Sequence, residues 1–163
     1  MTPTVGLLYS AVKENNQRLK SITEGMSLEE VEYKGPNNNF NSTAQLINHL
    51  SYVDLKWVYR IKGESLPPSL EEKYGPALDA EGRLPMIKNK SLGSLVSDYE
   101  EIIKMLKETC TQLRDADLER ATAFGHDNEK QATIRWGIWH IADHSRYHQA
   151  NINLLRRWYV KET

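Results

Sequence analysis

Three of the five histidines lie in one short segment near the C-terminus, at His140, His144 and His148. On an α-helix, a spacing of four residues places successive side chains one above another on one face. Two neutral imidazoles one turn apart can bind a divalent cation, and a third ligand would come from another element. The same spacing also arises by chance among surface or hydrogen-bonded core histidines. The motif therefore indicates a candidate metal site that the rest of the chain must support.

The length and charge of the chain limit the classes of function. Its 163 residues suffice for a single domain with its own core, and we expect one domain over residues 1–163. The formal net charge of -1 gives no electrostatic support for a nucleic-acid or anionic membrane surface. No apolar run approaches the roughly 20 residues that span a bilayer, and the N-terminus lacks a signal-peptide pattern. We therefore expect a soluble, cytoplasmic protein that binds neither nucleic acid nor membrane.

Apolar residues recur every three or four positions in four segments, which predicts four amphipathic helices. The expected helices cover residues 4–23, 43–62, 91–113 and 133–159. Ser42 and Gln45 have the form of a capping box before the second helix, and Gly63 should end it. The connections at 26–40, 64–90 and 115–132 are expected to be loops, because they are rich in Gly, Pro, Asn or charged residues.

Cys110 is the only cysteine, which excludes an intramolecular disulfide and any CxxC zinc or redox site. It falls within the apolar stripe of the third helix, so we expect a small buried hydrophobe and not a nucleophile. His126 lies in the last polar connection, where an exposed loop residue is the simplest interpretation.

Helical geometry favours two of the three histidines in the last helix as metal ligands. Relative to Ile134, His148 lies at roughly -40°, His144 at about -80° and His140 at about -120° around the helix. His49 lies roughly 60° from the core residue Leu46 on the second helix. We therefore expect the metal ligands His49, His144 and His148, with His140 as a hydrogen-bonding or supporting residue.

Four helices of this length fit a four-helix bundle, in which ligands on facing helices converge in the core. Zinc bound by three histidines keeps a fourth position open for water or substrate, as catalytic zinc sites do. The sequence contains neither the Glu-x-x-His motif of carboxylate di-iron bundles nor HExxH. Haem would leave one of the histidines unexplained. The pattern therefore favours a single divalent ion.

The segments QLINHLSYVDLKWVYRIKGE and TIRWGIWHIADHSRYHQANI resemble the two signature regions of the DinB/YfiT-like family of metal-dependent proteins. In that family the second helix carries one histidine and the last helix carries a pair, in a form close to NHxxYHRGQ. His49, His144 and His148 occupy the matching positions, and the segment DADLERATAFG is also similar. The family's HRGQ is replaced here by HQAN at residues 148–151.

The resemblance implies an all-α, DinB/YfiT-like bundle of four main helices with a long loop between helices two and three. It also implies a frequent homodimer with a three-histidine site for zinc, nickel or a similar divalent ion. Some members resemble thiol S-transferases or isomerases that use bacillithiol, mycothiol or glutathione. We therefore expect a metal-dependent enzyme that transfers a low-molecular-weight thiol to electrophilic small molecules.

Two alternatives stay open at this stage. If water and not a thiol occupies the fourth metal position, the same site could act as a hydrolase. A metal could instead only tie the second helix to the last one in a non-catalytic, dimeric bundle. Asp54 and Tyr147 are near enough in sequence to be considered as acid or base, although a surface or packing role is simpler for both.

Overall fold

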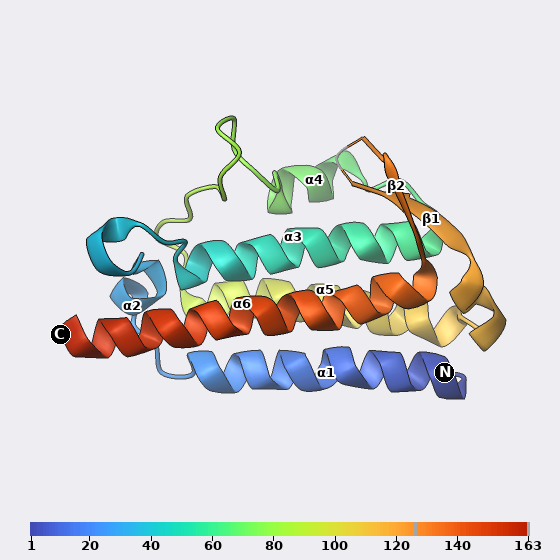
Figure 1. Cartoon of the computed structure of the whole chain (residues 1–163), viewed down its shortest axis with the longest axis horizontal. Helices are drawn as coiled ribbons and strands as arrows, with labels where there is room; N and C mark the ends of the chain where they lie inside the picture. Colours follow the sequence, from blue (N-terminus) through green and yellow to red (C-terminus); the bar gives the residue numbers. More distant parts are fainter. Residues whose placement is uncertain (126, 163) are drawn as a thin grey trace.

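Four long helices make up most of the chain. They are α1 (Pro3–Thr23), α3 (Thr43–Lys62), α5 (Leu92–Gln112) and α6 (Ile134–Glu162). In the computed structural model, which describes residues 1–125 and 127–162, these helices lie side by side along the long axis (Figure 1). This arrangement confirms the predicted all-α bundle. Among the described helices, none is long and apolar enough to cross a membrane.

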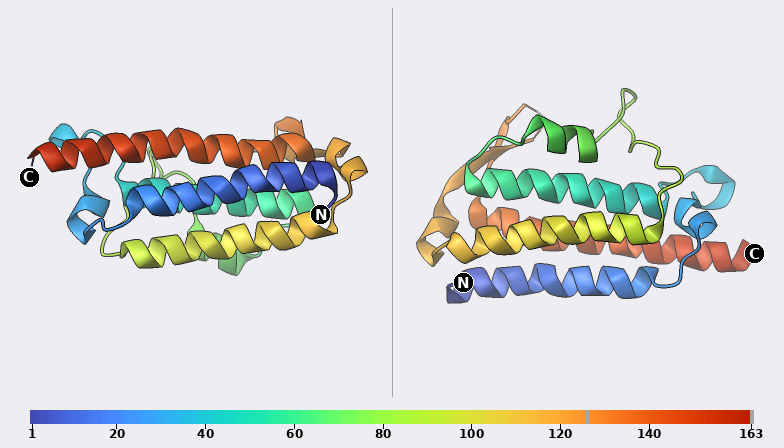
Figure 2. Two further views of the ribbon diagram at one scale, coloured as in Figure 1. Left: turned by 90° about the horizontal axis from the view of Figure 1, so that it is seen from below. Right: turned by 180° about the vertical axis from the view of Figure 1, so that it is seen from behind.

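The directions of the helices explain the long connection between α3 and α5. Figure 1 shows α1 and α6 running one way, and α3 and α5 running the opposite way, and the views in Figure 2 agree. The chain must therefore return along the bundle before it can start α5 parallel to α3. The connection that makes this return contains the short helix α4 (Pro68–Tyr74).

The ends of α3 follow the local signals in the sequence. The backbone N–H of Gln45 donates to Ser42 Oγ over 3.2 Å, and the backbone N–H of Ser42 donates to Gln45 Oε1 over 3.0 Å. This reciprocal pair is the predicted capping box. Gly63 ends the helix in the left-handed conformation, with φ of 75°, which glycine adopts without strain. Both ends of the helix that carries His49 are thus fixed locally.

The core is formed by apolar residues from all four long helices. Val12, Trp57, Ile102 and Ile138 are buried representatives, one from each helix. Cys110 is also buried, and burial raises the pKa of its thiol to about 12. A thiol with so high a pKa is a poor nucleophile at neutral pH, which agrees with the predicted packing role.

Several short elements lie in segments that the sequence predicted to be loops, and that prediction was wrong for them. They are α2 (Leu28–Glu32), α4, the 3₁₀ helices η1 (Pro36–Asn38) and η2 (Asp115–Glu119), and an antiparallel hairpin of β1 (Ala121–Phe124) and β2 (Lys130–Thr133). Each is too short for a hydrophobic period to be recognised. His126, predicted to be an exposed loop residue, lies outside the described residues.

Buried polar side chains join the helices at mid-length. The Gln149 side chain of α6 donates to the Asn15 carbonyl of α1 over 2.8 Å and to Ser145 Oγ over 3.0 Å. The Tyr99 hydroxyl of α5 donates to Asp54 Oδ2 of α3 over 2.7 Å. Buried polar groups with partners favour one arrangement of the helices over others.

Candidate metal centre

His49 from α3 and the pair His144 and His148 from α6 converge in the bundle. Each offers a ring nitrogen, and these three atoms lie within 4.8 Å of one another. The Nε2 atoms of His144 and His148 are 2.9 Å apart. The ring centroid of His49 lies 5.1 Å from that of His144 and 5.2 Å from that of His148. The structure thus brings together the three histidines that the sequence singled out, and their role as metal ligands stays a prediction.

Local structure accounts for this convergence. His144 and His148 lie one turn apart on α6, and Ser145 and Ile152 beside them are buried against the rest of the bundle. His49 follows the capped start of α3, a helix that packs against α6. His148 is buried, whereas the other two are half-buried. The cluster therefore lies at the edge of the core, where a small molecule can approach it.

The surroundings keep the three imidazoles neutral at neutral pH. Burial, together with the neighbouring His148, His49 and His140, lowers the pKa of His144 to about 3. Burial, followed by the effect of His49, lowers the pKa of His148 to about 4. Burial also lowers the pKa of His49, and a backbone hydrogen bond with Ala77 opposes this effect. Neutral imidazoles have the free lone pair that a metal ligand needs.

The donor set fits a zinc or nickel ion. Ligand atoms that bind one zinc ion at about 2.1 Å in a tetrahedral arrangement lie about 3.4 Å apart, and the separations in the cluster bracket that value. The Nε2 atoms of His144 and His148 face each other, so their Nδ1 atoms, which are buried without a hydrogen-bond partner among the described residues, lie on the far side of each ring. Imidazole nitrogens suit zinc, nickel and copper better than magnesium or calcium.

His140 lies outside the cluster but next to it. Its ring stacks on Trp136 at a centroid distance of 4.6 Å and on His144 at 5.3 Å. The ring of Trp57 lies 5.8 Å away, edge to face. The sequence predicted that His140 is a hydrogen-bonding or supporting residue beside the ligands. In the structure its contacts with His144 and the tryptophans are contacts between rings.

The two residues considered as acid or base have different positions. Asp54 is buried and accepts its hydrogen bond from Tyr99, on the α5 side of α3, so it does not join the histidine cluster. Tyr147 is 68% exposed, and its ring lies 5.2 Å from that of His148. Tyr147 thus has a ring contact with a candidate ligand, whereas the hydrogen bond of Asp54 is with Tyr99.

Two cavities lie near the cluster, one lined by His148 and the other by His140, which stacks on His144. The larger one has a volume of about 720 Å³ and lies between α3, residues 76–80, Gly82 and His140. The smaller one has a volume of about 270 Å³ and is lined by His148, Tyr147 and aromatic or aliphatic side chains such as Phe40 and Trp158. Both volumes are close to those of small-molecule sites in other proteins.

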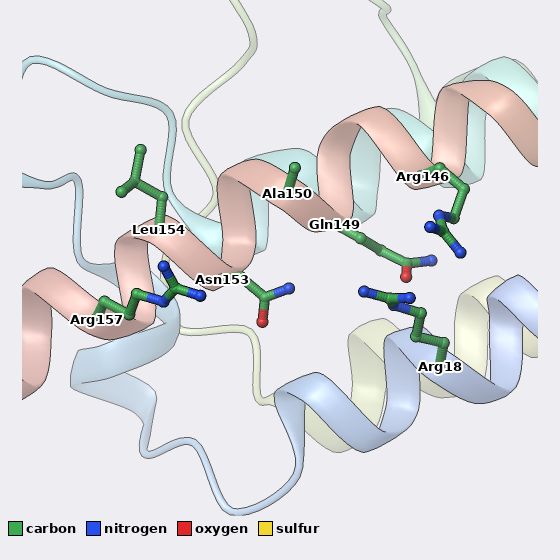
Figure 3. A pocket seen from close by; sticks show the side chains of 7 residues that line it. All are labelled: Arg18, Arg146, Gln149, Ala150, Asn153, Leu154 and Arg157. Atoms are coloured by element: carbon green, nitrogen blue, oxygen red, sulfur yellow. The ribbon is translucent and has the colours of Figure 1, made fainter.

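A third hollow, of about 390 Å³, lies on the other side of α6. Arg18 from α1 and Arg146 and Arg157 from α6 line it, with Gln149 and Asn153 between them (Figure 3). None of His49, His144 and His148 lines this hollow, so it is separate from the candidate metal centre.

Sequence reasoning missed the residues that shape the larger cavity. The segment 76–82 was predicted only as part of a loop, and its position over α3 follows from the return of the chain to α5. Lys56 and Arg60 also line the cavity. Their spacing of seven and eleven residues from His49 was a usable signal, because it places all three on one helical face.

Comparisons with known proteins show which family and which fold the chain shares. The family described as mycothiol-S-transferase matches residues 7–159. The protein "Uncharacterized protein YkkA" of Bacillus subtilis (strain 168) is 47% identical over 158 residues, which cover 96% of this chain and 89% of that protein. A crystal structure of a conserved protein from Enterococcus faecalis superposes with a TM-score of 0.75 at 15% identity, over 99% of both chains. The last comparison shows a shared fold.

Proposed function

Because the chain belongs to the mycothiol-S-transferase family, within the DinB/YfiT-like superfamily, we propose that it joins the sulfur of a low-molecular-weight thiol to an electrophilic small molecule. The observation that carries this proposal is the cluster of His49, His144 and His148, whose ring nitrogens lie within 4.8 Å of one another. These three side chains would hold a zinc or nickel ion.

The chemistry requires a thiolate at neutral pH. A divalent ion with an open position stabilises a bound thiolate over the thiol, which lowers the pKa of the thiol. The neutral state of His144 and His148 supports this role, because protonated imidazoles could not hold the ion. The partial burial of the cluster also limits competition by water.

The proposed reaction is a substitution at carbon. The thiol gives up its proton to solvent, and the sulfur supplies the electron pair of the new S–C bond. The bond between that carbon and the leaving group breaks, and the leaving group departs with its electron pair. The product is a thioether of the thiol.

The two cavities suit a reaction with two substrates. The larger cavity is lined by His140, which stacks on His144, and the smaller one is lined by His148. We assign the thiol to the larger cavity and the electrophile to the smaller one, whose aromatic wall suits apolar groups.

The test is an activity assay with zinc-loaded and nickel-loaded protein. Glutathione and 1-chloro-2,4-dinitrobenzene serve as probes, and thioether formation is followed by absorbance. We expect turnover by the parent, none above background by His148→Ala, and parental turnover by Asn153→Ala, which changes the α1 side of the same helix. Failure of metal-loaded parent with a panel of thiols and electrophiles would contradict the proposal. Ester hydrolysis without any thiol would favour the hydrolase alternative.

A further inference from the structure

Two cations line the larger cavity on the same face of α3 as His49. Lys56 and Arg60 follow His49 by seven and eleven residues, so the helical period stacks the three side chains along one side. With a rise of about 1.5 Å per residue, Lys56 lies roughly 10 Å and Arg60 roughly 16 Å along the axis from His49. The Lys56 ammonium lies over the ring of Tyr52, one turn nearer His49, which brings its charge closer to the histidine than the helical rise alone.

Neither cation forms an ion pair within residues 1–125 and 127–162. The Lys56 ammonium lies 5.4 Å from the centroid of the Tyr52 ring. The Arg60 guanidinium lies 5.2 Å from the Trp57 ring and donates to the Gly125 carbonyl over 3.3 Å. Arg60 is half-buried, and burial lowers its pKa, which shows that its charge is incompletely solvated.

The acidic residues of the cavity already have donors. Glu71 accepts a hydrogen bond from the Tyr52 hydroxyl. Asp79 accepts from the backbone N–H groups of Glu81 and Arg83, and its carboxylate pairs with the Arg83 guanidinium at 3.4 Å. The charge of Glu129 also reaches Arg60, although the two form no ion pair. The two carboxylates of the cavity belong to α4 and the loop after it, whereas the two cations belong to α3 and have no ion-pair partner among the described residues.

We infer that the thiol cosubstrate carries a carboxylate, which Lys56 and Arg60 recognise while its sulfur lies at the histidine cluster. This inference rests on the proposed function. In a thiol of tripeptide size, about 7 Å separates the sulfur from a terminal carboxylate, and this length spans the gap to the leaning Lys56 side chain. A cavity of about 720 Å³ accommodates such a molecule. A neutral, glycoside-type thiol would leave both cations without an anion.

The first measurement is binding, which needs neither metal nor turnover. S-methylglutathione, whose sulfur is blocked, is compared with its diethyl ester by isothermal titration calorimetry. The parent is expected to bind the diacid about tenfold more tightly than the diester. Lys56→Gln should lose about tenfold in affinity for the diacid and keep the parental affinity for the diester. Lys56 is the decisive variant because its side chain donates no hydrogen bond within the described part of the chain.

Lys62→Gln is the matched control. Lys62 is also a lysine of α3, but its ammonium lies over the Tyr59 ring and outside the cavity. The inference would be overturned if the parent bound the diacid and the diester equally well, or bound neither. It would also be overturned if Lys56→Gln and Lys62→Gln lost the same affinity for the diacid.

The second measurement separates this inference from the proposed function. The ratio kcat/KM is measured for glutathione and for glutathione diethyl ester with zinc-loaded parent and Lys56→Gln. A parental preference for glutathione that disappears in the variant would support the inference. Equal turnover of both thiols by both proteins would overturn it and leave the transferase proposal intact. Absence of conjugation with every thiol would instead contradict the proposed function, and with it the role of the cavity in binding a cosubstrate.

Discussion

Asp54→Asn should change the pH dependence of folding. Asp54 is 1% exposed, its Oδ2 accepts from Tyr99, and its Oδ1 has no partner among the described residues. Burial raises the pKa of this carboxyl to about 8, against the usual 3.8, and the Tyr99 hydrogen bond opposes the shift. The folded protein therefore binds the proton more tightly than the unfolded chain, so Asp54 lowers stability as the pH rises from about 4 to about 8.

The magnitude follows from the linkage relation. One protonation difference changes the free energy of unfolding by about 1.4 kcal/mol per pH unit, or about 3 kcal/mol between pH 5 and pH 7.5. The asparagine keeps a carbonyl that can accept from Tyr99, but it does not titrate. The stability of Asp54→Asn relative to the parent should therefore rise with pH by this amount. His144 and His148, whose folded pKa values are lowered, cost stability as the pH falls below about 6.5 in both proteins, and their effect cancels in the difference.

Urea unfolding of parent and variant at pH 5, 6, 7 and 7.5 measures this difference. Glu108→Gln, which changes an exposed glutamate of α5, is the control and should show a constant difference from the parent. A difference between Asp54→Asn and parent that does not vary with pH would refute the reasoning, because Asp54 would then be ionised in the folded protein.

Further changes test the packing, the smaller cavity and the assembly. A methyl group at Gly137 would lie 2.7 Å from the Trp57 ring, so Gly137→Ala should lower the free energy of unfolding by about 2 kcal/mol in thermal melts. Gly93→Ala is the control, because its methyl group meets only a side chain 3.9 Å away. This variant should stabilise α5 by up to about 1 kcal/mol. Equal melting temperatures would contradict this. Tyr147→Ala should raise KM for the electrophile several-fold at unchanged KM for the thiol, and the opposite pattern would reverse the assignment of the cavities. The predicted homodimer should use the exposed apolar side of α6, which includes Trp139. Light scattering should therefore show a dimeric parent and a monomeric Trp139→Glu variant. A monomeric parent would show that the prediction is wrong.

Local signals were sufficient to predict the long helices and the histidine cluster. The capping box at Ser42 and the left-handed Gly63 determine the first and last residues of α3 to within one position, because both signals depend only on neighbouring atoms. The angles around α6 placed His144 and His148 nearer the core than His140, and the structure brings those two, and not His140, together with His49. A four-residue spacing on a regular helix determines relative direction, so no tertiary information was needed.

The parts of the structure that the sequence did not predict depend on contacts between distant segments. The hairpin of β1 and β2 has four paired positions and no alternating apolar pattern, so its pairing is set by the ends of η2 and α6. The cavity wall at residues 76–82 depends on the path of the chain from α3 back to α5. Asp54 was considered as a catalytic group because of its distance in sequence, but five residues along a helix turn it away from His49 and toward Tyr99.

Metal content measures the central claim most directly. Protein purified without an affinity tag or added metal is analysed by inductively coupled plasma mass spectrometry, beside His49→Ala and the double variant His144→Ala, His148→Ala. We expect about one zinc or nickel ion per chain in the parent and none in either variant, because three ligands from two helices are required. A parent that stays metal-free after incubation with excess zinc and nickel, or variants that keep the parental metal content, would contradict the three-histidine site.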